Sequence, residues 1–293
     1  MRHVFLLLVL SMFSNCPAFN AAALFADECP PADDAAKQIQ PPVAVKVPTN
    51  RSKFHLFLLA GQSNMAGRGT VEAADTTVHS NVLSLDKNNQ WVTAIDPLHF
   101  DKPTVVGVGI GRTFALDYAA KHPGVTVGLI PCAAGGSPIS SWEPGGYHEQ
   151  TKNHPYDDAI ERTRLALKSG KLTGILWHQG ESDSGPEKSV LYEASLHQLI
   201  KRFRTKLESP TVPFIAGQMG QFSKRPWSDS KKLVDSVHQS LPQNVTYCGF
   251  ANSNGLGHRG DNVHFNSEAY RELGHRYFSA FEAITDTKNE DSK

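Results

Sequence analysis

Short apolar runs alternate along this chain with longer stretches in which apolar residues recur every three or four positions. The short runs predict buried strands at residues 54–60, 82–85, 125–131, 172–178, 212–218 and 245–250. The longer stretches predict amphipathic helices at residues 111–121, 156–168, 187–207, 228–241 and 267–283. Nearly continuous apolar strands separated by helices indicate an α/β fold, in which helices cover both faces of a central parallel sheet.

The same pattern predicts one domain, residues 51–285, because it contains no internal repeat and no second alternation of its own. Residues 27–50 are rich in proline, alanine and charge and lack both periodicities. They predict an extended N-terminal arm. Residues 286–293 are polar and predict a C-terminal tail.

Residues 1–26 have the features of a secretory signal peptide. A charged start at residues 1–3 precedes the apolar run VFLLLVL, and alanines at positions 21–23 and 26 offer cleavage points. The run is short for a membrane span. We therefore expect a secreted chain without stable membrane association after cleavage, and an uncleaved anchor is the alternative. Sequons at Asn50 and Asn244 would be glycosylation acceptors on this route.

Charge and cysteine usage exclude several classes of partner. The chain has 29 acidic and 29 basic side chains and no basic run, which argues against a nucleic-acid partner. Cys16 belongs to the signal segment, so Cys29, Cys132 and Cys248 allow at most one internal disulfide. We expect Cys132 and Cys248 to be buried thiols, and a pair with Cys29 is the alternative. No Cys or His spacing matches a zinc site, so no metal is predicted.

The first predicted strand ends abruptly at a serine. The run FHLFLLA is followed by Gly61, Gln62, Ser63 and Asn64, so the strand delivers Ser63 to one edge of the sheet. Open α/β sheets keep their ligand sites at the carboxyl edge. Ser63 is therefore a candidate nucleophile.

Other polar segments follow strands that end at the same edge. Gly135 and Gly136 come after the strand at 125–131, and glycine lets a backbone N–H approach a ligand closely. Gln179 comes directly after the strand at 172–178 and carries a donor amide. These groups are candidate donors to an oxyanion, which acyl transfer requires.

An aspartate and a histidine stand three residues apart near the end of the chain, in DNVHFN. At this spacing the carboxylate of Asp261 can accept from one ring nitrogen of His264 while the other faces Ser63. Four separate segments thus meet the needs of a serine hydrolase: a nucleophile, a base, a carboxylate that orients the base, and oxyanion donors.

These motifs resemble those of the SGNH hydrolases, and more closely the carbohydrate esterase family 6 acetylesterases and sialate O-acetylesterase-like proteins. The blocks are GQSNMAG, AAGGS, HQGESD and DNVHF, in the family order, and they span most of the predicted mature chain. The resemblance implies a three-layer α/β/α sandwich of flavodoxin-like type. It also implies serine esterase chemistry without metal or cofactor, acting on acetylated sugars.

The resemblance also implies individual roles. Ser63 would be the nucleophile, His264 the base and Asp261 its orienting carboxylate. The oxyanion donors would be the Ser63 N–H, the Gly136 N–H and the Gln179 side chain, although general SGNH enzymes carry Asn at the last position.

Several assignments stay open at the level of sequence. Glu181 competes with Asp261 as the partner of His264, or it fixes loop geometry. The sequence does not separate Gly135 from Gly136.

Three further residues, Asn64, Trp142 and His258, are candidates for supporting roles. Asn64 is expected to tie the nucleophile turn to a neighbouring loop. Trp142 is a candidate for sugar stacking, whereas Trp177 inside a strand is expected in the core. His258 is expected in the substrate pocket.

Three rival functions bear on this interpretation. An α/β-hydrolase carries its serine in GxSxG on a mid-chain turn, whereas Ser63 lies in GQSNM after the first predicted strand. A lipid or aryl esterase of the same superfamily is the enzymatic alternative. A secreted carbohydrate-binding protein without turnover is the alternative from a different class. The joint presence of Ser63, Asp261 and His264 argues against it.

Overall fold

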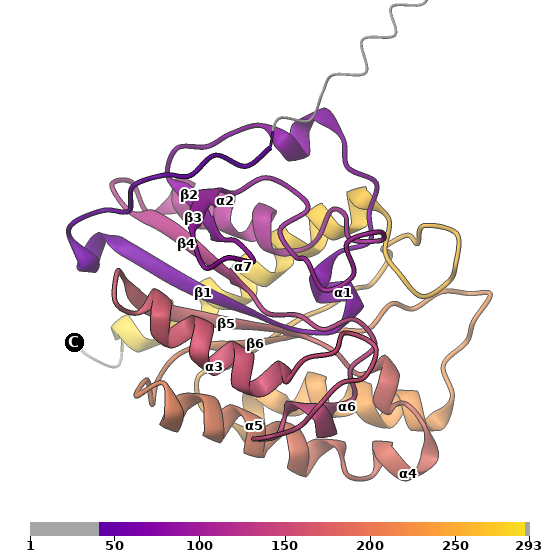
Figure 1. The fold of residues 1–293 in the computed structure, drawn as a ribbon. Coiled ribbons are helices and arrows are strands. Elements are labelled where there is room, and N and C mark those ends of the chain that lie inside the picture. The colour runs from indigo at the N-terminus through magenta and orange to yellow at the C-terminus, as the bar shows by residue number, and fades with distance from the viewer. Residues whose placement is uncertain (1–40, 291–293) are drawn as a thin grey trace, which may run out of the picture. The chain divides into compact units, whose positions relative to one another are not determined.

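The computed structural model describes residues 41–290, and the side chains of residues 41–285. The predicted signal peptide, residues 27–40 of the arm and Cys29 lie outside this part. The described chain forms one seven-stranded sheet flanked by helices (Figure 1). The strands are β1 Phe54–Gly61, β2 Val82–Leu85, β3 Trp91–Thr93, β4 Thr126–Pro131, β5 Lys171–His178, β6 Phe214–Gly217 and β7 Cys248–Ala251.

The strand order across the sheet is β3-β2-β4-β1-β5-β6-β7. Every pair of neighbours is parallel except β2 and β3, which form an antiparallel pair at one edge. Strand β1 lies in the middle, because the chain builds one side of the sheet with β2 to β4 and then crosses to β5 on the other side. Ligand sites of open α/β sheets lie at this kind of crossover.

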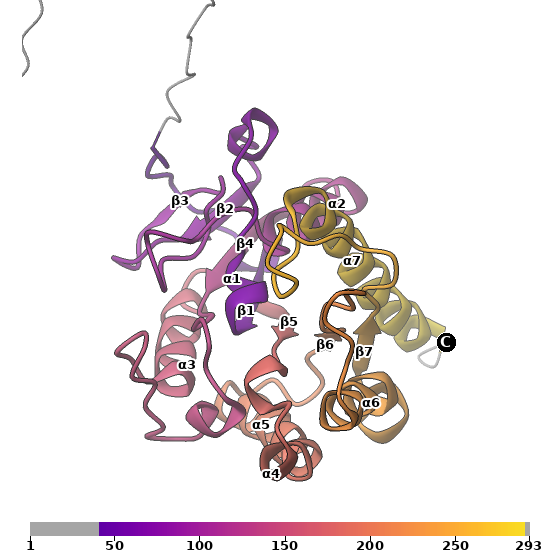
Figure 2. The same ribbon diagram turned by 90° about the vertical axis from the view of Figure 1, so that its right-hand side faces the viewer.

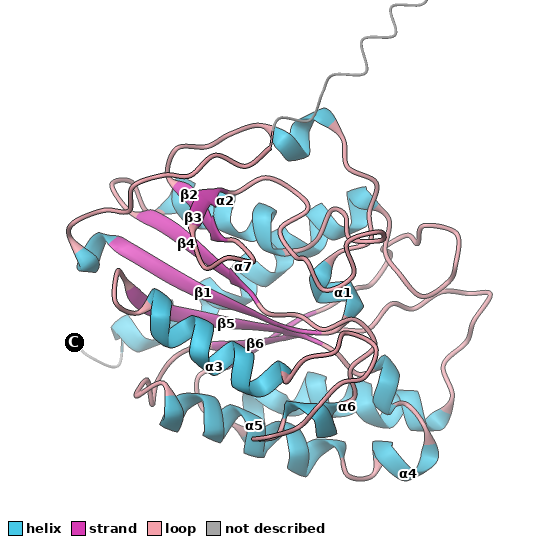
Figure 3. Cartoon of the chain, viewed as in Figure 1, coloured by secondary structure: helices cyan, strands magenta, loops and turns pink. Residues whose placement is uncertain are grey.

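Seven helices complete the described fold, as Figure 3 shows in cyan. They are α1 Ser63–Ala66, α2 Gly111–Lys121, α3 Pro155–Ala166, α4 Pro186–Ser189, α5 Tyr192–Lys206, α6 Asp229–Asn244 and α7 Ser267–Glu290. Short 3-10 helices lie at Arg51–Lys53, Ala73–Thr76, Ile139–Trp142 and Glu181–Asp183.

The helices divide into two layers, which Figure 2 shows on opposite sides of the sheet. Alternate β1 side chains Leu56 and Leu58 pack with buried residues of α3, α5 and α6. The intervening Phe57 and Leu59 pack with buried residues of α2 and α7. Strand β1 is apolar throughout because it is covered on both faces. The three-layer α/β/α architecture predicted from the sequence is confirmed.

Some predicted boundaries are wrong, each for a local reason. Strand β3 was missed because it has only three residues after a tight turn in which Asn89 has φ +61°. The helix predicted at 187–207 is broken between α4 and α5. Strand β7 starts late because α6 extends to Asn244 and Tyr247 turns the chain with φ +57°. Helix α7 continues to Glu290 because no glycine or proline stops it after residue 283.

Residues 43–45, in the described part of the predicted arm, lie along β3. Val45 N–H donates to the Trp91 carbonyl at 3.0 Å, and Thr93 N–H donates to the Val43 carbonyl at 3.0 Å. Cys132 and Cys248 are buried free thiols. Within residues 41–290, no helix is long and apolar enough to cross a bilayer.

Candidate active site

The turn at residues 61–63, here called the serine turn, is hydrogen-bonded to the end of β5 and to the segment after β4. Gly61 has φ +133°, and a Cβ on it would lie 2.2 Å from the His178 carbonyl oxygen, so only glycine fits. Gln62 N–H donates to His178 O at 2.9 Å, and Ala134 N–H donates to Gly61 O at 2.9 Å. The turn then starts the short helix α1 at Ser63, which is 8% exposed.

The structure brings together three predicted residues that are up to 201 positions apart in sequence. His264 Nε2 lies 2.9 Å from Ser63 Oγ. His264 Nδ1 lies 2.7 Å from Asp261 Oδ2. With the proton on Nδ1, Nε2 presents its lone pair to the serine hydroxyl. This is the alignment that general-base activation of a hydroxyl requires.

Backbone hydrogen bonds hold Asp261 in its ionised form. Partial burial by itself would raise the pKa of this carboxyl. Hydrogen bonds from the His264 backbone, the His264 side chain and the Val263 backbone outweigh burial and lower the pKa to about 2. A permanent negative charge beside Nδ1 favours the ring when it takes up a proton.

Asn64 joins the serine turn to the histidine loop, as the sequence suggested. Its buried amide donates to Glu181 Oε1 at 2.6 Å and to the Val263 carbonyl at 3.1 Å. The Tyr270 hydroxyl donates to Asn64 Oδ1 at 2.7 Å. Glu181 therefore binds the asparagine, and Asp261 contacts the histidine ring.

Gly135 and Gly136 differ in what their N–H groups do. Gly135 N–H donates to Asp101 Oδ2 at 2.8 Å. Gly136 has φ +88°, and its N–H has no hydrogen-bond partner among residues 41–290. The Ser63 N–H is likewise unpaired within the described chain. Two backbone donors that follow the adjacent strands β1 and β4 are therefore open, and of the two glycines only Gly136 has an unpaired N–H within the described chain.

The prediction that Gln179 donates directly to an oxyanion is wrong for this structure. Its amide nitrogen donates to Ser137 O at 3.1 Å and to Asp183 Oδ2 at 2.5 Å, so both hydrogens are used. Its oxygen accepts from the Tyr192 hydroxyl at 2.8 Å, and the residue has no exposed surface. The longer side chain reaches into the core instead, where it fixes the loop after β4.

Trp142 is also misplaced by the sequence prediction. It is fully buried, its indole N–H donates to Ser137 Oγ at 2.9 Å, and its ring packs edge-on against Trp177 at 5.1 Å. The loop after β4 folds back as a 3-10 helix and inserts this ring into the core. Trp142 therefore does not present a stacking surface to a sugar. Trp177 lies in the core, as expected.

His258 organises the loop that carries Asp261. Its Nδ1 accepts from Gly260 N–H at 3.0 Å and from Asn262 N–H at 3.3 Å. Its ring packs against Phe222 at 4.9 Å. The structure thus gives His258 contacts that shape the loop, and its place in a substrate pocket stays a prediction.

Sequence reasoning missed Asp101 as a supporting residue of the site. Besides Gly135, its Oδ2 accepts from Arg68 Nη2 at 2.8 Å in a buried ion pair. A second missed contact is the Arg259 guanidinium, which donates to the Arg68 carbonyl at 2.8 Å. Asp101 lies in an aperiodic stretch between predicted elements, so no pattern pointed to it. In the part of the chain whose side chains are described, no group of three His, Cys, Asp or Glu residues could hold a metal ion.

The order of the strands and the layers of helices give a fold shared with a protein of Parabacteroides merdae described as a GDSL-like lipase, at 13% identity and a TM-score of 0.50 over 80% of this chain and 98% of that one. Family comparison gives a narrower placement. The family model "Carbohydrate esterase, sialic acid-specific acetylesterase" matches residues 53–283, and the chain belongs to this family of carbohydrate esterases.

Individual relatives agree with this placement. A protein of Arabidopsis thaliana described as a probable carbohydrate esterase is 31% identical over 256 residues, 80% of this chain and 91% of the relative. The X-ray structure of that Arabidopsis protein covers 78% of this chain and 98% of its own, at 29% identity and a TM-score of 0.69. A carbohydrate acetylesterase of Xanthomonas citri shares the fold at 21% identity and a TM-score of 0.59. It covers 78% of this chain and 56% of its own.

Proposed function

We propose that this protein is a serine esterase that removes O-acetyl groups from sugars through an acetyl-serine intermediate. The observation that carries the proposal is the hydrogen-bonded line from Asp261 through His264 to Ser63, with distances of 2.7 Å and 2.9 Å. Membership of the carbohydrate esterase family supports acetylated carbohydrate as the substrate class. The acetylesterase described from Xanthomonas citri supports the acetyl group as the acyl portion.

The first half of the reaction forms the acetyl-enzyme. His264 Nε2 takes the Ser63 proton as Oγ attacks the ester carbonyl, and Asp261 stabilises the imidazolium. The oxyanion of the tetrahedral intermediate accepts from the Ser63 and Gly136 N–H groups, whose hydrogen bonding is otherwise unused. His264 then gives its proton to the departing sugar oxygen, and the acetyl group stays on Ser63 Oγ as an ester.

Water completes the cycle. His264 removes a proton from water, the resulting nucleophile attacks the acetyl carbonyl, and the same two N–H groups hold the second oxyanion. Collapse releases acetic acid and returns the proton to Ser63. Every proton in this sequence passes through His264, so no cofactor is part of the proposal.

The test is acetate release from acetylated xylan, acetylated pectin and O-acetyl sialic acid, measured side by side. Wild type and the control Ser189→Ala, which alters a buried serine in α4, should release acetate from at least one of them. Ser63→Ala should release none while its melting temperature stays near that of wild type. Activity retained in Ser63→Ala would refute the nucleophile, and no release by wild type would refute the carbohydrate substrate.

Acyl length separates this proposal from a lipid or aryl esterase. The small-residue loop AAGGS after β4 supports a preference for short acyl groups. Turnover of p-nitrophenyl esters should fall from acetyl to octanoyl. A rate that rises along this series would favour a lipase.

We further propose that the protein is secreted and glycosylated. The signal-like residues 1–26 and the exposed positions of Asn50 and Asn244 support this. Expression in a eukaryotic secretory host should give a medium fraction that starts between residues 20 and 27. Its mass should fall on treatment with an N-glycosidase. Intracellular retention with residues 1–26 intact would contradict the proposal.

A further inference from the structure

The two glycines after β4 lie in a tight turn whose middle peptide can face either of two ways. Ser137 N–H donates to the Ala134 carbonyl at 3.1 Å, which closes a β-turn over residues 134–137. Gly136, the third residue of this turn, has φ +88°, whereas the φ of Gly135 is not positive. This combination defines a type II turn. In a type I turn the peptide between the second and third residues is rotated by about half a turn, so its N–H and its carbonyl exchange directions.

Side chains within the turn do not decide between the two types. A Cβ on Gly135 would lie 2.5 Å from Arg68 Nη2 and 2.6 Å from Asp101 Oδ2, two atoms that are held in a buried ion pair. Gly136 needs glycine because other residues rarely adopt its positive φ. A pair of glycines allows both turn types, because neither residue has a side chain that limits φ and ψ. The direction of the middle peptide therefore depends on its hydrogen bonds.

Within the described chain, side chains bind every backbone hydrogen-bonding group of the two glycines except one. Asp101 Oδ2 accepts from Gly135 N–H at 2.8 Å, and Ser182 Oγ donates to the Gly136 carbonyl at 2.9 Å. The Gly135 carbonyl, which belongs to the middle peptide, lies 3.2 Å from His148 Nε2. The exception is Gly136 N–H, on the other side of the same peptide. Among the described residues, His148 alone hydrogen-bonds the middle peptide.

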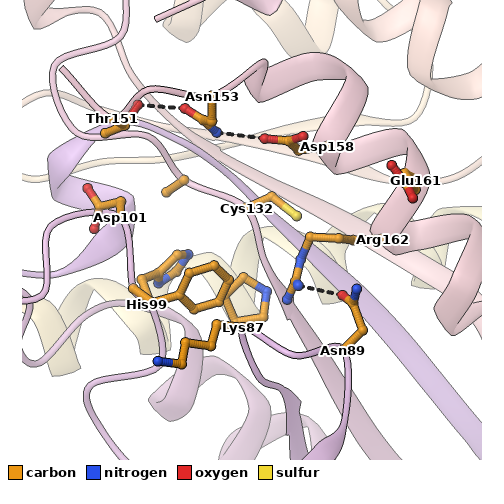
Figure 4. A pocket seen from close by; sticks show the side chains of 13 residues that line it. Lys87, Asn89, His99, Asp101, Cys132, Thr151, Asn153, Asp158, Glu161 and Arg162 are labelled. Carbon is orange, nitrogen blue, oxygen red and sulfur yellow. Dashed lines mark hydrogen bonds between the residues drawn. The ribbon is translucent and has the colours of Figure 1, made fainter. Parts of the chain in front are cut away.

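His148 is anchored independently of the glycine turn. A carbonyl oxygen only accepts, so His148 Nε2 carries the hydrogen and donates it to Gly135. His148 is 7% exposed, and its backbone N–H donates to the Asn153 carbonyl at 2.9 Å. The Asn153 side chain accepts from Thr151 Oγ1 at 2.6 Å and donates to Asp158 Oδ2 in α3 at 2.8 Å, as Figure 4 shows. The donor to the middle peptide is therefore held in place by α3.

Rotation of the middle peptide would remove one of the two proposed oxyanion donors. The Gly136 N–H would turn away, and the Gly135 carbonyl would present its partial negative charge in the same direction. That charge would repel a developing oxyanion, which needs donors at this place. We propose that His148 is a positioning residue, which holds the middle peptide in the direction that leaves Gly136 N–H available to the oxyanion. This inference rests on the proposed function, because it assigns His148 a task within the same reaction.

Kinetics of His148 variants test this task. His148→Phe keeps a ring but has no donor, so kcat for p-nitrophenyl acetate should fall by between about tenfold and 10³-fold, the upper figure corresponding to loss of a whole oxyanion donor. KM should change little, because the donor acts on the transition state more than on the bound ester. His148→Gln places an amide N–H where the ring had Nε2 and should recover most of kcat. A general loss of structure would not be reversed by this substitution.

His154 gives a matched control on the same loop. It is exposed, and its Nδ1 lies 3.0 Å from the Gly146 carbonyl, so it makes the same kind of hydrogen bond away from the glycine turn. His154→Phe should leave kcat unchanged. His148→Met also lacks a donor, and its unbranched side chain adapts to irregular space, so it repeats the test if phenylalanine disturbs folding. The melting temperatures of these variants should stay within a few degrees of wild type.

Crystal structures report the direction of the middle peptide without any need for turnover. Wild type, His148→Gln and His154→Phe should show Gly136 with a positive φ. His148→Phe and His148→Met should show a negative φ at Gly136, or a mixture of both directions.

Three results would overturn the inference. They are an unchanged middle peptide in both variants without a donor, a kcat in those variants equal to that of wild type, and a His148→Gln protein as slow as His148→Phe. A wild type without esterase activity would instead refute the proposed function. The crystal structures would then decide separately whether His148 sets the direction of the peptide.

Discussion

The proposed nucleophile and the proposed base are held in opposite ways. Ser63 is 8% exposed and follows a strand that is hydrogen-bonded on both sides, so the core sets its position. The side chains of His264 and Asp261 are 24% and 40% exposed, on an irregular loop held by a few polar contacts. A strand end gives rigidity, whereas the loop depends on individual hydrogen bonds. Substitutions on the loop should therefore cost activity with little loss of stability, whereas replacing the buried Asn64, which hydrogen-bonds the turn to the loop, should cost both.

The largest expected effect is that of His264→Ala, which tests the loop side of the comparison. Without a base, kcat/KM for p-nitrophenyl acetate should fall on the order of 10⁶-fold, as for histidines of other serine hydrolases. The melting temperature should stay within a few degrees because the ring is partly exposed. A fall of ten degrees or more would show that the loop supports the fold and would break the comparison.

Asp261→Asn should have the next largest effect, on the order of 10⁴-fold in kcat, because the amide favours the wrong histidine tautomer. A pH series sharpens this test. The pKa of Asp261 is lowered to about 2 against an ordinary 3.8, so its contribution to stability is present above pH 3.8 and is lost as pH falls towards 2. Acid unfolding of the variant, followed by circular dichroism, should lack this contribution. Identical acid unfolding of both proteins would contradict the assigned contacts.

Asn64→Ala tests the link between the two regions. The buried Glu181 oxygen and the Val263 carbonyl would lose their donor, and the histidine loop would shift. We expect kcat to fall on the order of 10²-fold with KM little changed, and the free energy of unfolding to fall by about 1–3 kcal/mol. Tyr270→Phe removes one hydroxyl from the same asparagine and should lose less of each. Equal losses in the two variants would exclude the asparagine as the link.

The smallest effect is expected at Asp96, a carboxyl outside the site. Asp96 is buried, whereas the Asp261 side chain is 40% exposed, so the two carboxyls should respond to pH in opposite ways. Burial raises the pKa of Asp96 to about 8 despite the opposing charge of Arg112. A raised pKa in the folded state means that stability falls as pH rises from 3.8 through 8. Asp96→Asn should remove at least about 1 kcal/mol of this decline, measured by urea unfolding at pH 5 and pH 8. An unchanged pH dependence would show that Asp96 is ionised in the fold.

The sequence predicted the long elements whose positions are set by burial of their apolar side chains in the core. The apolar runs at 54–60 and 172–178 could only be buried strands, and they placed Ser63 and Gln179 at one sheet edge. The three-residue strand β3 and the break before α5 were missed because short elements carry too few positions for a period to show. The late start of β7 and the longer α6 depended on the positive φ of Tyr247, which no apolar pattern encodes.

Within the site, sequence spacing predicted a contact between two residues of the same loop. It did not predict which group in another segment a hydrogen-bond donor would bind. The pairing of Asp261 with His264 follows from three residues of separation in one loop. The destination of the Gln179 amide could not be read, because it depends on Asp183 and Ser137 in the folded neighbourhood. The prediction that Trp142 stacks on a sugar was wrong for a related reason. A loop rich in glycine and proline suggests exposure, but this loop packs the indole of Trp142 against Trp177.

The extended residues 43–45 along β3 have a consequence for self-association. A bare edge strand is a template on which another chain can add, and this is a common route to aggregation. Here the hydrogen bonds of Val43 and Val45 already occupy one side of β3. Cleavage between residues 20 and 27 would leave residues 43–45 paired with β3. Removal of the chain through residue 45 would instead leave the outer backbone groups of β3 free to pair with another molecule.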